Sequence, residues 1–117
     1  MATLTFTKLF NPTQLGTSGS PTTVYTVPAT VSTTVLQNGQ VRLVNTSSSV
    51  QAVTLYAVPS AGSSGNANTF AFEENIPANG GRVDVNIPQM GPGDTLIGYA
   101  SAATSVTIQP MSGVLYS

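Results

Sequence analysis

The sequence predicts an all-β protein folded as an antiparallel β-sandwich of the jelly-roll kind, with a short N-terminal arm. Its 117 residues are enough for one domain. Apolar and β-branched residues alternate at a period of two, as in half-buried strands. Eight prolines and eleven glycines are spread through the chain and interrupt every potential long helix. About eight or nine short runs then recur at the regular spacing typical of a sandwich.

The predicted strands are separated by short turn signals. In chain order they are 23–27, 31–37, 41–45, 52–58, 69–72, 82–87, 95–100, 105–109 and 113–116, after a first run at 4–10. In 82–87, every second residue is predicted to point inward, and the same holds for 52–58. The inward sets are Val83, Val85 and Ile87, and Val53, Leu55 and Ala57, with Thr54 and Tyr56 on the opposite face.

The connections have recognisable turn chemistry. Asn38-Gly39 lies between two apolar runs, and this dipeptide favours a two-residue hairpin because both positions tolerate positive φ. Turns are also predicted at 76–81 and at Gly91-Pro92-Gly93-Asp94, and a mobile loop at 61–68.

The chain is predicted to consist of two parts. Residues 1–22 form an N-terminal arm with a hinge, and residues 23–117 form the sandwich domain. The stretch 15–21 (LGTSGSP) has the composition of a hinge. The arm carries Leu4, Phe6, Leu9 and Phe10, which we expect to bind a partner, because an extended arm can add a strand to a neighbour's sheet edge. The alternative is that this run is simply the first strand of the sandwich.

Charged residues are unusually rare. Only 6% of the residues are Asp, Glu, Lys or Arg, against about 25% in an ordinary domain. Three scattered cations cannot form a phosphate-binding footprint or a polybasic membrane patch, so we expect no nucleic-acid or membrane partner.

The N-terminus lacks a signal-peptide apolar run, and no stretch is long and apolar enough to span a bilayer. Strands such as 52–58 carry little charge to protect an edge, which favours a homo-oligomer, with a trimer preferred over a dimer.

Reactive side chains are almost absent. With no cysteine and no histidine, the usual ligands for zinc, haem and iron–sulfur clusters are missing, as are Ser–His and Cys–His pairs. A carboxylate pair remains the one alternative, from Glu73, Glu74, Asp84 and Asp94. Solvated surface and turn roles suit these acids better, so we expect no enzyme, no cofactor and no metal. Asn45-Thr46-Ser47 matches a glycosylation sequon and is interpreted as a loop.

Several motifs resemble those of small tailed-phage virion proteins. The matching segments are 44–47 (VNTS), 53–59 (VTLYAVP), 76–81 (IPANGG), 93–102 (GDTLIGYASA) and 111–114 (MSGV), so the resemblance covers about residues 41–116. It implies a non-enzymatic jelly-roll protein of the virion that decorates or cements the capsid, with the major capsid protein as partner and the capsid surface as location. A neck, fibre or receptor-binding (carbohydrate-binding) module of the virion is the alternative. The arm, residues 1–22, falls outside the resemblance.

Overall fold

The computed structural model describes residues 4–6, 8–29 and 34–116, and in this part of the chain it is an all-β sandwich. The predicted residues 31–33 and the start of the arm lie outside the described residues. The strands are β1 (Leu4–Phe6), β2 (Thr13–Gln14), β3 (Thr22–Thr26), β4 (Val35–Asn45), β5 (Gln51–Val58), β6 (Thr69–Ile76), β7 (Gly81–Asn86), β8 (Thr95–Ala100) and β9 (Val106–Tyr116). A short 3-10 turn, η1 (Asn66–Asn68), precedes β6 and lies within the predicted loop 61–68.

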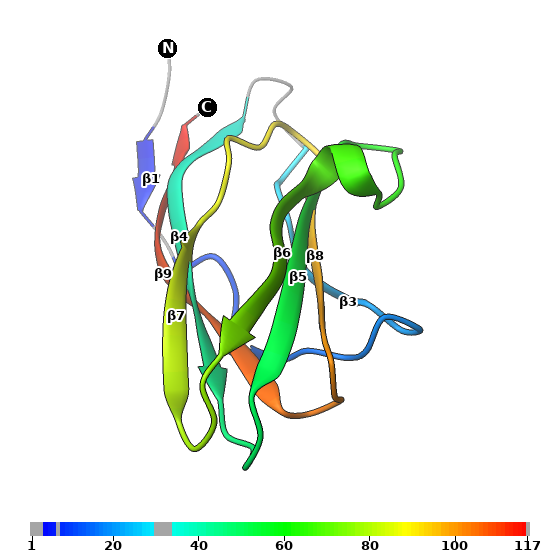
Figure 1. Ribbon diagram of the computed structural model, residues 1–117. Coiled ribbons are helices and arrows are strands. Elements are labelled where there is room, and N and C mark those ends of the chain that lie inside the picture. The colour runs from blue at the N-terminus through cyan, green and yellow to red at the C-terminus, as the bar shows by residue number, and fades with distance from the viewer. Residues whose placement is uncertain (1–3, 7, 30–33, 117) are drawn as a thin grey trace.

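Two antiparallel sheets pack face to face (Figure 1). The first has the order β1-β9-β4-β7, with β2 also paired to β9, and the second has the order β3-β8-β5-β6. Within this arrangement β5 pairs with β6, β4 with β7, β3 with β8, and β2 with β9. The chain is therefore one long nested hairpin that has rolled up, and the roll is closed by the lateral pairs β4–β9 and β5–β8. This is the jelly-roll arrangement, so the predicted fold class is confirmed.

The core lies between the sheets and is filled by alternate residues of the central strands. Val53 and Leu55 of β5 are fully buried and Ala57 packs against them, as the alternation predicts. On β7, Val83 and Val85 point inward but are only half buried, because β7 is the last strand of its sheet. Burying aliphatic side chains of this size contributes about 1.5–3 kcal/mol each.

The predicted hairpin at Asn38-Gly39 is wrong. β4 runs through both residues, and its register against β9 shifts between Gln37 and Gln40. Asn38 does adopt the left-handed conformation, with φ of 55°. The conformational preference was therefore correct, but it serves a β-bulge inside a long strand rather than a turn between two strands.

Two other strands are longer than predicted. The runs 105–109 and 113–116 form one strand, β9, which passes through Pro110. Proline fits there because the described residues of β1 and β2 pair with β9 only on either side of it, at 114–116 and 107–108. β6 continues past Phe72 to Ile76 through a second bulge, at which Glu73 has a φ of 48°.

The described part of the N-terminal segment pairs with strands of the sandwich. β1 and β2 both pair with β9. Leu15, in the predicted hinge, is 1% exposed and belongs to the core, and Gly16 bridges to Tyr99 of β8. These contacts favour a sandwich-strand role for residues 13–16. Whether the residues before Thr13 act as an attachment arm stays a prediction.

The segment 52–58 does not form an edge. β5 lies between β8 and β6, so both of its sides are hydrogen-bonded. The expectation that this strand forms an unprotected edge is therefore wrong: its lack of charge reflects a central position in the sheet and gives no support for self-association.

Candidate functional site

The acidic side chains weighed as a catalytic pair have separate structural surroundings. Asp94 closes the turn after Gly91: its Oδ2 accepts a hydrogen bond from the Gly91 N–H at 2.8 Å, and its Oδ1 accepts one from the Ser60 N–H at 3.0 Å. Gly93 has a φ of 79° and Asp94 N–H donates to the Gly91 carbonyl, so the segment is a type II turn. The predicted turn role of Asp94 is confirmed.

Asp84 is held by Arg42 on the outer face of the first sheet. The Arg42 Nε and Nη2 groups donate to the two carboxylate oxygens at 2.8 and 3.2 Å. These hydrogen bonds lower the pKa of Asp84 and raise the pKa of Arg42. The two charges neutralise each other locally. Among the described residues, no group of three or more acidic side chains could share a metal ion.

The sequon asparagine is a structural residue. Asn45 is fully buried, and its Nδ2 donates to the carbonyls of Ser49 (2.8 Å) and Ile76 (3.0 Å). Its Oδ1 accepts from both the N–H and the hydroxyl of Ser47, at 2.9 and 2.7 Å. The amide therefore anchors the loop after β4 to the end of β6, and in the folded chain it is inaccessible to glycosylation. The loop interpretation is confirmed for Thr46 and Ser47, whereas Asn45 is the last residue of β4.

The predicted partner-binding residues are Leu4, Phe6, Leu9 and Phe10. The first two lie on β1, paired with Tyr116 and Val114 of β9. Leu9 and Phe10 are half buried and pack against the core, and the Phe10 ring lies 6.2 Å from the Tyr25 ring between centroids. Leu9 and Phe10 therefore contact the sandwich of their own chain. Binding of a partner by these residues stays a prediction.

The second sheet carries charged residues only on its last strand, β6. Strands β3, β5 and β8 of the second sheet contain no Asp, Glu, Lys or Arg. Their outer face instead carries two neighbouring tyrosines, Tyr56 and Tyr99, with ring centroids 6.1 Å apart. The adjacent Tyr99 raises the pKa of Tyr56. The outer face of the first sheet is polar and holds the Arg42–Asp84 pair.

The charged side chains concentrate on one side of the sandwich. β6 and β7 are the last strands of their sheets on this side, and we call the surface that they form the β6/β7 flank. It carries four of the seven charged residues of the chain: Glu73 and Glu74 on β6, and Arg82 and Asp84 on β7. Charges on edge strands discourage unspecific strand pairing. The opposite edge strands, β1, β2 and β3, carry none.

Phe72 is the most exposed large apolar residue of the flank, at 67%. The bulge in β6 explains its position. Phe72 and Glu73 together stand opposite Thr54 of β5, and the Glu73 N–H donates to the Thr54 hydroxyl at 3.2 Å. A hollow of about 430 Å³ beside the ring is lined by Phe72, Thr69 and Asn66.

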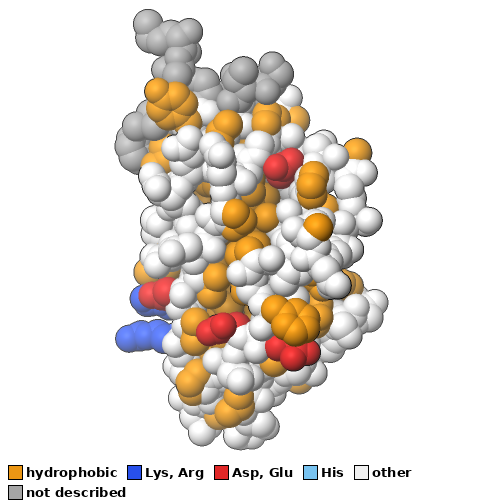
Figure 2. Space-filling model, turned by 45° about the horizontal axis from the view of Figure 1, so that its top comes forward, with side chains coloured by type: hydrophobic (Ala, Val, Ile, Leu, Met, Phe, Trp, Pro, Cys, Tyr) orange, Lys and Arg blue, Asp and Glu red, His pale blue; other side chains and the backbone are white. Residues whose placement is uncertain are grey.

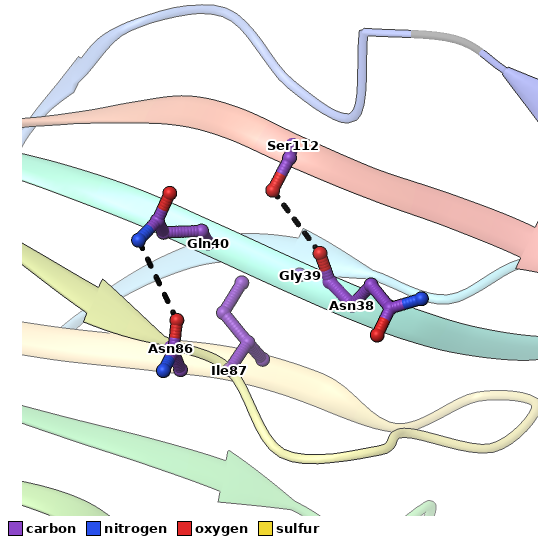
Figure 3. A pocket seen from close by; sticks show the side chains of 6 residues that line it. All are labelled: Asn38, Gly39, Gln40, Asn86, Ile87 and Ser112. Atoms are coloured by element: carbon purple, nitrogen blue, oxygen red, sulfur yellow. Dashed lines mark hydrogen bonds between the residues drawn. The ribbon is translucent and has the colours of Figure 1, made fainter.

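A second hollow, of about 400 Å³, lies on the first sheet at the bulge in β4 (Figure 3). It is lined by Asn38, Gly39, Gln40, Asn86, Ile87 and Ser112. The Gln40 amide donates to Asn86 at 3.5 Å, and the Ser112 hydroxyl donates to the Asn38 carbonyl at 3.1 Å. A Cβ on Gly39 would lie only 3.1 Å from the Cβ of Ile87, so glycine keeps the floor of the hollow open. All of its side chains are uncharged.

Comparisons with known proteins identify the fold and nothing more specific. No protein-family model matches the chain, and no curated protein sequence matches it. Solved structures do match. They include the structure of infectious bursal disease virus Gx strain, with 15% identity, 99% of this chain covered and a TM-score of 0.50. They also include the T13 viral particle of the same virus, with 9% identity, 99% coverage and a TM-score of 0.50. This chain spans about a third of the length of those chains, 32% and 30% respectively.

Two features of the surface were not predicted from the sequence: the exposure of Phe72 and the clustering of charged residues on β6 and β7. The exposure of Phe72 depends on the bulge at Glu73, and neither Phe nor Glu favours positive φ, so no local signal indicates it. The clustering of charge on β6 and β7 depends on which strands are last in their sheets.

The described residues contain no helix with the length and apolar composition that a bilayer-spanning segment needs.

Proposed function

We propose that this protein is a non-enzymatic structural protein of a virus particle, which binds the outer surface of a phage capsid as a decoration or cement protein. Its partners are the major capsid protein and further copies of itself, with a trimer preferred over a dimer. The proposal is carried by the jelly-roll strand order of this chain together with the alignment of 99% of it, at a TM-score of 0.50, with parts of two virus-particle structures. A fold alone does not define a function, so the chemistry of the surface has to agree.

The surface agrees in three respects. The described carboxylates are in turns, in an ion pair or on an exposed edge, and none faces a second carboxylate across an enclosed cleft. The outer face of β3, β5 and β8 is uncharged and presents tyrosines, which are common in protein interfaces. Solubility depends on Ser, Thr, Asn and Gln rather than on charge, as suits a protein docked in an assembly.

The mechanism is mass action. A protein that binds the assembled lattice and has no affinity for separated subunits stabilises the lattice in proportion to its own binding free energy. The decisive experiment is rebinding. Shells stripped of the protein are mixed with the purified chain, bound protein is measured by co-sedimentation, and shell rupture is followed by heating. We expect saturable binding and a higher rupture temperature. Absence of binding at micromolar concentration would refute the proposal.

A second candidate is a fibre, neck or receptor-binding module of the virion that recognises carbohydrate. The observation that favours it is the amide-lined hollow of Figure 3, because amides can both donate to and accept from sugar hydroxyls. The same purified chain tested on a glycan array decides between the two. Binding to glycan without binding to shells would replace the first proposal with this one.

A further inference from the structure

The β6/β7 flank combines an apolar strip with charges of opposite sign on its two margins. In Figure 2, hydrophobic side chains run down the middle of the visible face and basic side chains project at its margin. On the strands of the flank, Val83 and Val85 of β7 and Phe70 of β6 are half buried and pack against the core. Exposed Phe72 stands on its β6 side, next to the hollow that it lines.

The charges of the flank are unequally satisfied. Arg42 already neutralises Asp84 at 2.8 Å. Arg82, Glu73 and Glu74 are exposed, and no ion pair involves any of them among the described residues. The β7 margin therefore has one free positive charge, and the β6 margin has two free negative charges.

We infer that the β6/β7 flank is a self-association surface, at which Arg82 of one copy lies against Glu73 and Glu74 of another. A second copy fits because the flank is complementary to itself: each margin offers the charge that the other lacks, and Phe72 offers an apolar knob beside a hollow. A face-to-face dimer makes this contact twice and a ring of three makes it three times. The charge pairing, rather than the number of copies, is therefore the feature to test.

The bulge at Glu73 supports this role. Glu73 has a φ of 48°, in the left-handed region, and strained backbone at residues other than glycine is concentrated at functional surfaces. Here the bulge presents Phe72 and Glu73 together on an exposed edge. Contact with a second copy would bury the Phe72 ring and pair the Glu73 carboxylate with a cation.

Charge reversal with rescue tests the contact. The variants are Arg82→Glu, the double variant Glu73→Lys/Glu74→Lys, and the triple variant that combines them. Lys8→Glu is the matched control, because Lys8 is also an exposed cation but lies outside the flank. Sedimentation velocity at low salt measures the dissociation constant, since surface charges are screened within about 10 Å at 0.1 M salt.

We expect Arg82→Glu and the double variant each to raise the dissociation constant about tenfold or more, and the triple variant to return it to within about threefold of the original. Phe72→Ser should weaken association without altering charge. Lys8→Glu should have no effect. A chain that is monomeric at every concentration would overturn the inference, as would reversal variants that associate normally or a triple variant without recovery. Circular dichroism and melting temperature establish that each variant is folded.

This inference rests on the self-association part of the proposed function, and the two can fail separately. A monomer that still binds stripped shells would overturn the flank contact and leave capsid decoration standing. An oligomer that responds to charge reversal but ignores shells would do the reverse.

Discussion

Replacing Asn45 with alanine should be among the most damaging single changes in the chain. The side chain is fully buried and makes four hydrogen bonds, two as donor and two as acceptor. In Asn45→Ala the carbonyl of Ile76 loses its partner in a buried position. The loop from Asn45 to Ser49 also loses its attachment to the turn that leads into β7.

The magnitude follows from these contacts. A net contribution of about 1 kcal/mol for each of the other three hydrogen bonds, and about 1–3 kcal/mol for the stranded Ile76 carbonyl, gives a destabilisation of roughly 4–6 kcal/mol. That is a large part of the 5–15 kcal/mol of a typical domain. At about 3–5 °C per kcal/mol for a domain of this size, the melting temperature should fall by roughly 12–30 °C.

Chemical denaturation of the original chain, Asn45→Ala and Asn45→Asp measures the effect. Asn45→Asp should be at least as destabilising at neutral pH, because a buried carboxylate would face the two carbonyls that now accept from the amide. Thr46→Ala is the control, since Thr46 is exposed and lies next in sequence. A loss of less than about 1 kcal/mol in Asn45→Ala would refute the view that this amide clamps the loop.

Three further predictions concern the ion pair, the N-terminal segment and the turn before β7. Arg42 lowers the pKa of Asp84 from its ordinary value of 3.8, so the pair stabilises the fold above that pH, and this contribution is lost as the pH falls through the folded-state pKa. Melting curves from pH 2 to 7 should therefore show a steeper acid loss for the original chain than for Asp84→Asn, and parallel curves would contradict this. Deleting residues 2–12 should abolish shell binding but leave a folded sandwich, because β2 and Leu15 remain; if circular dichroism shows unfolding instead, the segment is an essential first strand. Gly81→Ala should lower the free energy of unfolding by about 2 kcal/mol or more, because the added Cβ would overlap the Pro77 carbonyl. In the control Gly65→Ala the Cβ meets open space, so its melting temperature should stay close to that of the original chain. Equal melting temperatures for the two variants would refute the overlap.

Local patterns predicted most of the strands and their inward faces. Val83 and Val85 alternate with charged residues, and a period of two has only one solution when one face is buried. Turn chemistry was equally informative at Gly91-Pro92-Gly93-Asp94, where proline and glycine at these positions suit a type II turn.

Long-range pairing could not be predicted. Asn38-Gly39 satisfies the backbone needs of a hairpin and of a bulge alike, and the choice depends on β7 and β9, which are distant in sequence. The same limit applies to the candidate site. Phe72, Glu73 and Arg82 become a surface only because β6 and β7 are the last strands of two stacked sheets.

The nested pairing of the strands also sets an order of events during synthesis. β5 and β6 are neighbours in sequence and can pair as soon as both have left the ribosome, whereas β3 must wait for β8, roughly 70 residues later. At about 5–20 residues per second, that is a wait of roughly 3–14 seconds. During it β3 has no partner strand, and it holds three threonines among its five residues. Its polar composition and the prolines that flank it, Pro21 and Pro28, limit the scope for pairing with another nascent chain.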